Sequence, residues 1–205
     1  MITIVDYGVG NVQAFLNLFK RSGIDARCAK AVGDLDGSTH LILPGVGHFD
    51  RAMEKINNSG LRPKLDELVL AHNVKVLGIC VGMQMLAEGS DEGTLPGLSW
   101  IPGRVRALEK DPKLKGMPLP HMGWNTVDYE SDSSLFAEGF DGEANFYFLH
   151  SYYFDATDNS DVVGVSEYGL KFPSVVSKGN IHGIQCHPEK SHRWGEQILV
   201  NFGNL

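Results

Sequence analysis

In Val76-Leu77-Gly78-Ile79-Cys80-Val81-Gly82-Met83-Gln84, an apolar run leads into Gly-x-Cys-x-Gly and then into a helical pattern. A nucleophile held on a sharp strand-to-helix turn needs glycines two residues to either side, since larger side chains would collide with the neighbouring strand and helix. Gly78 and Gly82 meet that need around Cys80. The stretch therefore predicts a strand, a tight turn that presents Cys80, and a helix. The alternative interpretation is a buried core cysteine after a hydrophobic strand.

The first half of the chain, which leads up to this turn, alternates short apolar runs with amphipathic segments, and this is typical of βαβ units and a parallel sheet. We expect strands over residues 2–5, 24–28, 41–43 and 74–79, a helix over 12–19 that begins after Asn11, and helical structure over 49–72. The second half indicates strands over 104–108, 126–129, 145–149, 152–155, 162–167, 174–177 and 181–186, then a closing helix over 191–202 with Ser191 as its cap. The sequence predicts one α/β domain over residues 1–205. Its central sheet is mixed and mostly parallel, with flanking helices and an antiparallel part.

Two further segments could complete a reactive site. His187 ends an apolar strand and Glu189 follows two residues later, so a base and a carboxylate that orients it come together. Gly45 and Gly47 follow another short strand and allow backbone N–H groups to turn toward an oxyanion. Taken alone, the His187 segment is equally well an ordinary turn, and the glycine segment is better interpreted as a plain turn. Together with Cys80, they would meet at the carboxyl edge of a parallel sheet, where ligands bind in open α/β folds.

The charge and the apolar content of the chain argue against nucleic-acid-binding and membrane proteins. A net charge of −7 without a run of Lys or Arg argues against nucleic-acid binding and against attachment to an anionic membrane. The first residues form no basic and apolar leader, and no apolar run approaches the roughly 20 residues that cross a bilayer. We therefore expect a cytoplasmic enzyme.

Cys28, Cys80 and Cys186 are an odd number without a CxxC pair, and His182 and His192 are expected to be solvated. No disulfide, metal or cofactor is predicted.

The chain resembles the class I, triad-type glutamine amidotransferases, which have a flavodoxin-like fold, and most closely the glutaminase subunits of imidazole glycerol phosphate synthases. The resemblance covers essentially the whole length. It is carried by six segments: Val5-Asp6-Tyr7-Gly8-Val9-Gly10-Asn11, Leu43-Pro44-Gly45-Val46-Gly47-His48-Phe49, Gly78-Ile79-Cys80-Val81-Gly82-Met83-Gln84, Pro120-His121-Met122-Gly123-Trp124-Asn125, Phe148-Leu149-His150-Ser151-Tyr152 and His187-Pro188-Glu189-Lys190-Ser191. Cys186 departs from the pattern, because an aromatic residue stands there in many members, and we interpret Cys186 as a core residue.

The resemblance implies a glutaminase that hydrolyses glutamine to glutamate and ammonia. It implies that Cys80 forms a glutamyl thioester, that His187 moves the proton and that Glu189 orients His187. It places the oxyanion at backbone N–H groups of Val46, Gly47 and Val81, and the substrate at Gly45, Gln84, His150, Ser151 and Tyr152. No cofactor or metal enters this chemistry.

The resemblance also implies a partner: a (βα)8-barrel cyclase that forms a heterodimer with the glutaminase, receives its ammonia and completes a lyase-type synthase of histidine biosynthesis. Met122, Gly123, Trp124 and Asn125 match residues at that interface, and Lys190 matches one that pairs with a partner carboxylate. Trp124 could equally be a half-buried packing aromatic.

Three alternatives stay open. Residues 190–195 also resemble paralogues that supply ammonia for amidation of a bacterial surface-polysaccharide sugar. A cysteine peptidase or hydrolase could use the same three residues for general acyl transfer. An inactive regulatory subunit would have the fold without the chemistry, but it should lack a member of the triad or the oxyanion loop, and this chain has both.

Overall fold

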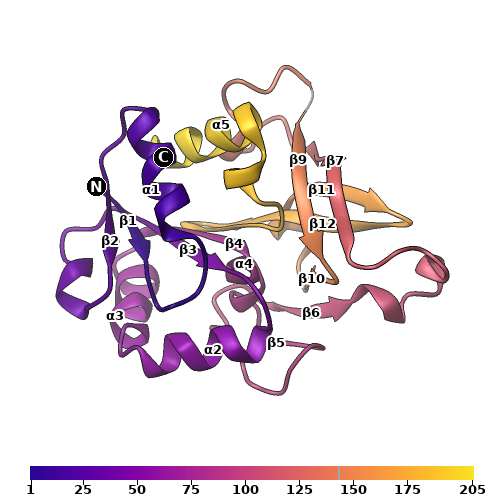
Figure 1. Cartoon of the computed structure of the whole chain (residues 1–205), viewed down its shortest axis with the longest axis horizontal. Helices are drawn as coiled ribbons and strands as arrows, with labels where there is room; N and C mark the ends of the chain where they lie inside the picture. Colours follow the sequence, from indigo (N-terminus) through magenta and orange to yellow (C-terminus); the bar gives the residue numbers. More distant parts are fainter. Residues whose placement is uncertain (143) are drawn as a thin grey trace.

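A computed structural model of the chain describes residues 1–142 and 144–205, and its centre is an eight-stranded sheet (Figure 1). The strands lie in the order β2-β1-β3-β4-β13-β12-β11-β8. The first five run parallel, and β12, β11 and β8 join them through antiparallel pairings. The predicted mixed sheet with an antiparallel part is therefore confirmed. The strand bounds are β1 Ile2–Val5, β2 Ala26–Ala29, β3 His40–Gly45, β4 Lys75–Cys80, β8 Asp128–Tyr129, β11 Val162–Tyr168, β12 Leu170–Lys178 and β13 Ile181–Ile184.

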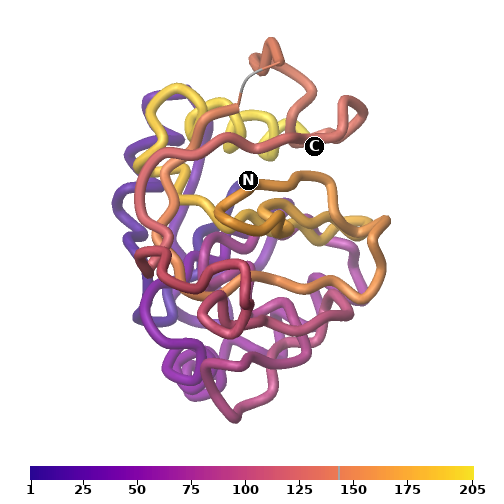
Figure 2. The backbone as a smooth tube through the Cα atoms, turned by 90° about the vertical axis from the view of Figure 1, so that its right-hand side faces the viewer, coloured from indigo at the N-terminus to yellow at the C-terminus, as the bar shows by residue number. Residues whose placement is uncertain are grey.

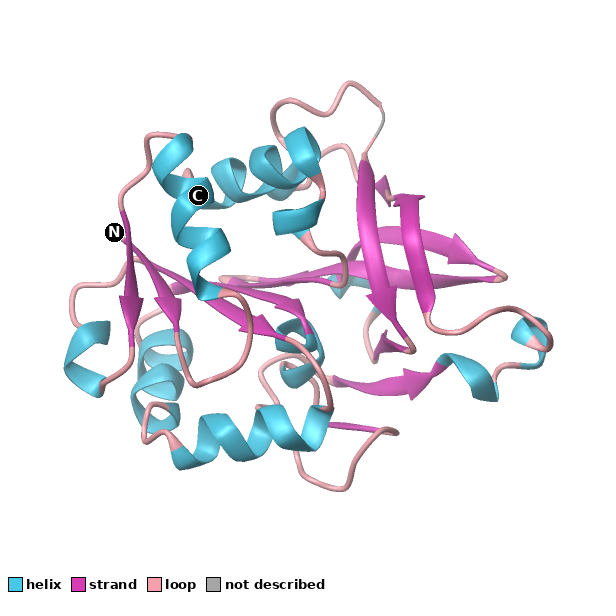
Figure 3. Cartoon of the chain, viewed as in Figure 1, coloured by secondary structure: helices cyan, strands magenta, loops and turns pink. Residues whose placement is uncertain are grey.

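Helices cover both faces of the parallel half of this sheet, with α1 and α5 on one side and α2, α3 and α4 on the other (Figures 1 and 3). Helix α1 begins as predicted, because the Asn11 side chain accepts a hydrogen bond from the Ala14 N–H and supplies a missing partner of the first turn. Its buried residues Phe15, Leu18 and Phe19 recur at helical spacing and face the sheet. The helices are α1 Val12–Arg21, α2 Phe49–Asn58, α3 Arg62–Asp66, α4 Val81–Met85 and α5 His192–Gly203, with short 3₁₀ turns at Val32–Leu35, Leu108–Lys110, Pro112–Leu114, Ser134–Phe136, Asn159–Asp161 and Pro188–Lys190.

Two smaller sheets lie beside the antiparallel half of the large one. One is a two-stranded antiparallel ribbon of β7 (His121–Thr126) and β9 (Asn145–His150), and the other contains β10 (Tyr152–Ala156), β6 (Gly103–Ala107) and β5 (Gly89–Ser90). Figure 2 looks onto this end of the molecule, so the strands of the second half face the reader. The sequence predicts one strand over 126–129. The structure instead has β7, which begins at His121, and the separate short strand β8, so the predicted start is wrong.

Other predicted features need correction, and the strand predicted over 174–177 already begins at Leu170. The helical stretch over 49–72 divides at Ser59 and Gly60, where Gly60 has a φ of 75°, and its last turn, Glu67–Ala71, is a π-helix. The last strand ends at Ile184 rather than at residue 186. Ser191 stands directly before α5, but its hydroxyl donates to the His187 carbonyl at 2.6 Å and accepts from the Tyr147 N–H, so it does not cap the helix.

The register of the parallel strands positions the site. Gly45 at the end of β3 is paired with Cys80 at the end of β4, and β13 pairs with the other side of β4. The segments that follow these three strands therefore leave the sheet at the same edge. Within the described residues, every helix is too short or too polar to cross a membrane.

Candidate active site

Cys80 ends β4 in a strained conformation, with φ 54° and ψ −113°, and α4 starts at the next residue. Backbone in this region is rare for a residue with a side chain and is maintained only where the surroundings enforce it. At Cys80 this conformation is maintained by close backbone packing around the two flanking glycines. A Cβ on Gly78 would lie 2.6 Å from the Gly82 carbonyl oxygen, and one on Gly82 would lie 1.9 Å from the Leu43 carbonyl oxygen. The predicted reason for these glycines is therefore confirmed.

The predicted base and its carboxylate meet just beyond β13. His187 Nδ1 lies 2.9 Å from Glu189 Oε1, and both side chains are almost fully buried. Because a carboxylate only accepts, Nδ1 carries the proton and Nε2 is left for the thiol. Burial lowers the pKa of His187, but hydrogen bonds to Cys80 and Glu189 and the attraction of their negative charges outweigh it and raise this pKa to about 10. The site thus favours an imidazolium beside the Cys80 sulfur.

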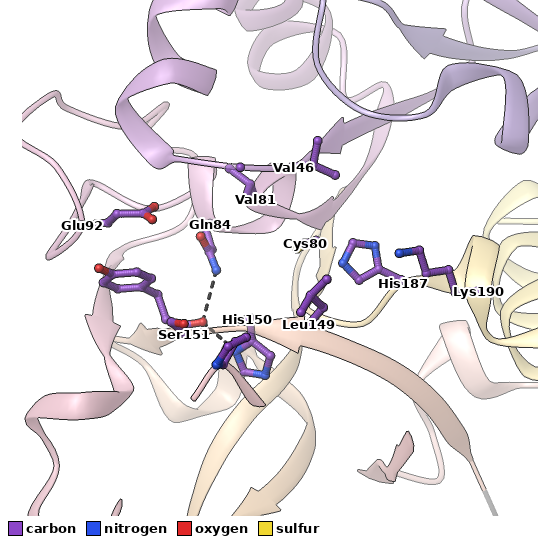
Figure 4. A pocket seen from close by; sticks show the side chains of 13 residues that line it. Val46, Cys80, Val81, Gln84, Glu92, Leu149, His150, Ser151, His187 and Lys190 are labelled. Carbon is purple, nitrogen blue, oxygen red and sulfur yellow. Dashed lines mark hydrogen bonds between the residues drawn. The ribbon is translucent and has the colours of Figure 1, made fainter. Parts of the chain in front are cut away.

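Cys80 and His187 line a cavity of 470 Å³ that the sequence motifs surround (Figure 4). The predicted residues on its wall are Val46, Gly47, Cys80, Val81, Gln84, His150, Ser151, Tyr152, His187 and Lys190. Gly45 lies behind the wall, where a Cβ would come within 2.2 Å of the Gly82 nitrogen. Its lack of a side chain lets β3 approach the turn that carries Cys80.

The predicted substrate residues differ in what they can offer a ligand. Both ring nitrogens of His150 are occupied, Nδ1 at 2.8 Å from the Tyr152 carbonyl and Nε2 at 2.8 Å from His121 Nδ1, so only its main chain is left for a ligand. Burial lowers the pKa of His150 to about 3, although the hydrogen bond to Tyr152 acts against it, and the ring is neutral at pH 7. The Gln84 amide reaches the same carbonyl at 3.2 Å.

Glu92 is a residue of the cavity that the sequence did not indicate. Its Oε2 accepts a hydrogen bond from the Phe49 N–H at 2.7 Å, which fixes the carboxylate at the start of α2. Asp50 anchors the same loop by accepting from the Thr94 and Leu95 N–H groups. Glu92 lies in a loop without a motif, so only the folded structure brings it to the cavity.

The predicted interface residues form an exposed patch next to the cavity. Met122 is 64 % exposed and Trp124 is 50 % exposed on β7, while Leu149 of β9 is 36 % exposed and also lines the cavity. Asn125 is half-buried on the same strand. Trp124 stacks on His192, with ring centroids 5.4 Å apart, and Lys190 lies over the Tyr147 ring. Trp124 is thus half-exposed and packs against a neighbouring ring, which fits both a packing aromatic and an interface residue, and an apolar surface of this kind is typical of protein interfaces.

The described residues contain no group of three or more His, Cys, Asp or Glu side chains placed to bind a metal ion. The three cysteines are free. Cys186 is completely buried, as its interpretation as a core residue requires, and burial raises the pKa of its thiol.

The family described as glutamine amidotransferase class-I matches residues 3–204. This chain belongs to that family. The amidotransferase is 51 % identical to the imidazole glycerol phosphate synthase subunit HisH of Bdellovibrio bacteriovorus and 43 % identical to that of Leptospira interrogans, with 100 % of each chain covered. It also resembles a solved structure described as a glutamine amidotransferase, with a TM-score of 0.76 at 18 % identity and coverage of 100 % of this chain and 99 % of the other. At that identity, the likeness supports the fold alone.

These comparisons confirm the predicted family, the amidotransferase class of enzyme, and the resemblance to imidazole glycerol phosphate synthase subunits. They do not favour the surface-polysaccharide alternative. The peptidase and inactive-subunit alternatives are not favoured, because the amidotransferase family matches residues 3–204 and Cys80, His187 and Glu189 lie together.

Proposed function

We propose that this chain is the glutaminase subunit of an imidazole glycerol phosphate synthase, with Cys80, His187 and Glu189 as its catalytic triad. The observation that carries the proposal is the strained Cys80 beside an imidazole that Glu189 fixes from behind, on the wall of a 470 Å³ cavity. The names of the relatives from Bdellovibrio bacteriovorus and Leptospira interrogans support the assignment to this synthase.

The first half of the reaction forms a thioester. The Cys80 thiolate attacks the amide carbon of the glutamine side chain, and the carbonyl oxygen becomes an oxyanion that backbone N–H groups of Val46, Gly47 and Val81 stabilise. His187 then donates its Nε2 proton to the departing nitrogen, so ammonia leaves and the glutamyl group stays on sulfur. Glu189 maintains the orientation of the ring throughout.

The second half releases glutamate. A water molecule attacks the thioester carbon while His187, now neutral, takes its proton. The tetrahedral species collapses, the carbon–sulfur bond breaks, and the Cys80 thiolate and the imidazolium are restored. The high pKa of His187 favours that resting ion pair, because the two charges compensate each other in a buried place.

The cavity wall also offers groups that could bind the α-ammonium group and the remaining atoms of the glutamine substrate. The Glu92 carboxylate at one end of the wall would bind the α-ammonium group. Ser151 and the main chain of residues 150–152 would bind the rest of the amino acid, together with Gln84. These roles are proposed from the position of each residue on the wall.

The exposed patch of Met122, Trp124 and Leu149 supports a partner that covers the mouth of the cavity. We assign to it a cyclase subunit of the (βα)8-barrel type, with Asn125 at the rim and Lys190 pairing with a carboxylate of the cyclase. Ammonia that passed directly into such a partner would escape protonation by bulk water. The pair would act in the cytoplasm, with residues 1–205 as one domain.

The proposal is tested by measuring glutamate release from glutamine. The chain is assayed alone, then with its cyclase partner, and then with the partner and the histidine-pathway acceptor, with Cys80→Ala as the control. We expect the complex with acceptor to be strongly stimulated and the Cys80→Ala complex to be inactive. Full activity of Cys80→Ala would overturn the triad, and a bound partner that gives no stimulation with this acceptor would favour the polysaccharide pathway.

A further inference from the structure

One backbone carbonyl fixes the direction of a buried hydrogen-bond network next to Cys80. The Tyr152 carbonyl oxygen lies 3.2 Å from the Gln84 amide nitrogen and 2.8 Å from His150 Nδ1. A carbonyl oxygen only accepts, so the atom of Gln84 that faces it is the NH₂ group, and His150 carries its proton on Nδ1. The orientation of a glutamine amide and the tautomer of a histidine are thereby set without reference to any ligand.

The first branch runs from this carbonyl to the reactive sulfur. Gln84 Nε2 also donates to Gln185 Oε1 at 3.1 Å, which uses both of its hydrogens. The Gln185 amide is then turned so that its own NH₂ group faces Cys80 Sγ, at 3.7 Å. Gln185 is completely buried and its side chain cannot exchange this partner for water. The network therefore presents a fixed N–H donor to the Cys80 sulfur.

The second branch runs from the same carbonyl to the exposed strand β7. His150 Nε2, which has no proton, accepts from His121 Nδ1 at 2.8 Å, and His121 Nε2 faces the Asn125 amide at 3.3 Å. The Asn125 amide nitrogen also donates to the Glu167 carbonyl, so its direction agrees with the chain. His121 is stacked between Phe148 and Tyr168, which confines its ring. The orientation of the Tyr152 carbonyl is thus supported from both sides.

We propose that Gln185 is a positioning residue for the nucleophile: its amide, held in one orientation by Gln84 and the Tyr152 carbonyl, donates a hydrogen bond that stabilises the Cys80 thiolate. The inference rests on the proposed role of Cys80 in glutamine hydrolysis. Gln185 directly follows the last residue of β13 and stands two residues before His187, so one short segment carries both the base and this donor. The sulfur then has two donors, an imidazolium and a neutral amide.

The other titratable groups around Cys80 do not replace this donor. Tyr7 donates its hydroxyl to the Pro44 carbonyl at 2.6 Å, and burial, followed by the nearby charge of Cys80, raises the pKa of Tyr7. Burial likewise raises the pKa of Cys186, so this neighbour is an uncharged thiol. Glu189 acts on the sulfur from behind His187. Lys190 lies on the same cavity wall, with its ammonium group over the Tyr147 ring. His187 is the positively charged side chain that hydrogen-bonds the sulfur, and Gln185 adds a neutral donor.

The test is the pH dependence of Cys80 alkylation. Iodoacetamide reacts with thiolates, so the rate at which the Cys80 peptide is modified, followed by mass spectrometry, rises with a midpoint that reports thiolate formation. This readout needs no partner subunit and is separate from the modification of Cys28. Hydrogen bonds to charged groups are strong enough that losing one should raise the midpoint by roughly one pH unit, or slow alkylation about tenfold at a fixed pH below it.

Two variants keep the test decisive. Gln185→Met has a similar length without a donor, and Gln185→Glu keeps the shape and the acceptor for Gln84 while placing an oxygen against the sulfur. We expect an upward shift in both, and none in the matched control Cys186→Ala, the next buried residue of the same segment. An unchanged midpoint in either folded Gln185 variant would overturn the inference. A wild-type complex that still releases glutamate after complete alkylation of Cys80 would instead overturn the proposed function.

Discussion

Lowering the pH from 6.5 to 5 should destabilise this protein far more than its carboxylates alone would allow, because four histidines are buried in a neutral form. Burial is the main cause that lowers the pKa of His150 to about 3 and the pKa of His40, His121 and His182 to about 4, and for His40 and His182 the charge of Lys75 adds to it. His182 was expected to be solvated, but it lies in β13 with its Nδ1 2.8 Å from the Ser177 hydroxyl.

The direction of the effect follows from proton counts. Below pH 6.5, each of these histidines is protonated in the unfolded chain and stays neutral in the folded one, so the unfolded state gains protons and folding stability is lost as the pH falls toward the folded pKa. His187 does not contribute in this window, because its pKa is raised to about 10 and it is protonated in both states; its contribution is lost only as the pH rises from 6.5 through 10.

The size is large on the scale of protein stability. Between pH 6.5 and 5, each histidine should lower the free energy of unfolding by about 1.6 kcal/mol, since a full proton difference is worth about 1.4 kcal/mol per pH unit. Four such groups give about 6 kcal/mol, a major part of the roughly 5–15 kcal/mol that a domain has in total. Most carboxylates keep their charge above pH 5, so they add little to this loss of unfolding free energy.

Urea unfolding followed by circular dichroism at several pH values between 5 and 7 measures this directly. The variant His182→Asn keeps a polar atom near Ser177 and removes one titrating ring, so its stability at pH 7 will change through packing. The slope of its stability against pH, however, should be about a quarter smaller than that of the wild type. A free energy of unfolding that stays constant from pH 6.5 to 5 would show that these histidines are not neutral in the folded protein.

Three further changes have definite outcomes. Gly82→Ala forces a Cβ to within 1.9 Å of the Leu43 carbonyl oxygen, so we expect a loss of roughly 1–3 kcal/mol and a thermal midpoint lower by about 3–10 °C; an unchanged melting curve would contradict this. Glu189→Gln removes the charge that supports the His187 imidazolium, and kcat for glutamine should fall on the order of 10³-fold, whereas a loss below tenfold would argue against the orienting role. Trp124→Ala should weaken binding of the cyclase about 30-fold in titration calorimetry, or about 2 kcal/mol, and unaltered affinity would place the interface elsewhere.

The turn around Cys80 could be predicted from the sequence because its cause is local. Gly78 and Gly82 are needed wherever a strand and a helix approach this closely, and the structure shows backbone atoms at the points where their side chains would stand. The order of strands in the first half was predictable for a similar reason, since alternating apolar and amphipathic segments require a parallel sheet covered by helices.

The strand that starts at His121 was missed because its burial pattern is weak. Along β7 only His121 is buried, while Met122 and Trp124 are exposed, so no apolar stripe marks the strand. The pattern of polar and apolar residues predicts a strand only when one face is buried in a core. Here the outer face is the surface assigned to the partner.

The hydrogen bonds that organise the site could not be predicted from the sequence either. Gln185 is separated from Cys80 by 105 positions in the sequence, and Gln84 is separated by 68 positions from Tyr152, whose carbonyl it contacts. A buried amide must find partners, but the sequence does not say which ones. Glu92 reaches the cavity through a contact with Phe49 that depends on the same kind of long-range packing.

Capture of the glutamyl thioester on Cys80 would show that glutamine hydrolysis passes through this intermediate. Hydroxylamine added to the turning-over complex competes with water for the acyl group, so we expect γ-glutamyl hydroxamate in proportion to hydroxylamine, with less glutamate formed. The same mixture with Cys80→Ala should give neither product. Continued release of glutamate without any hydroxamate would mean that water attacks glutamine directly and that no thioester forms on Cys80.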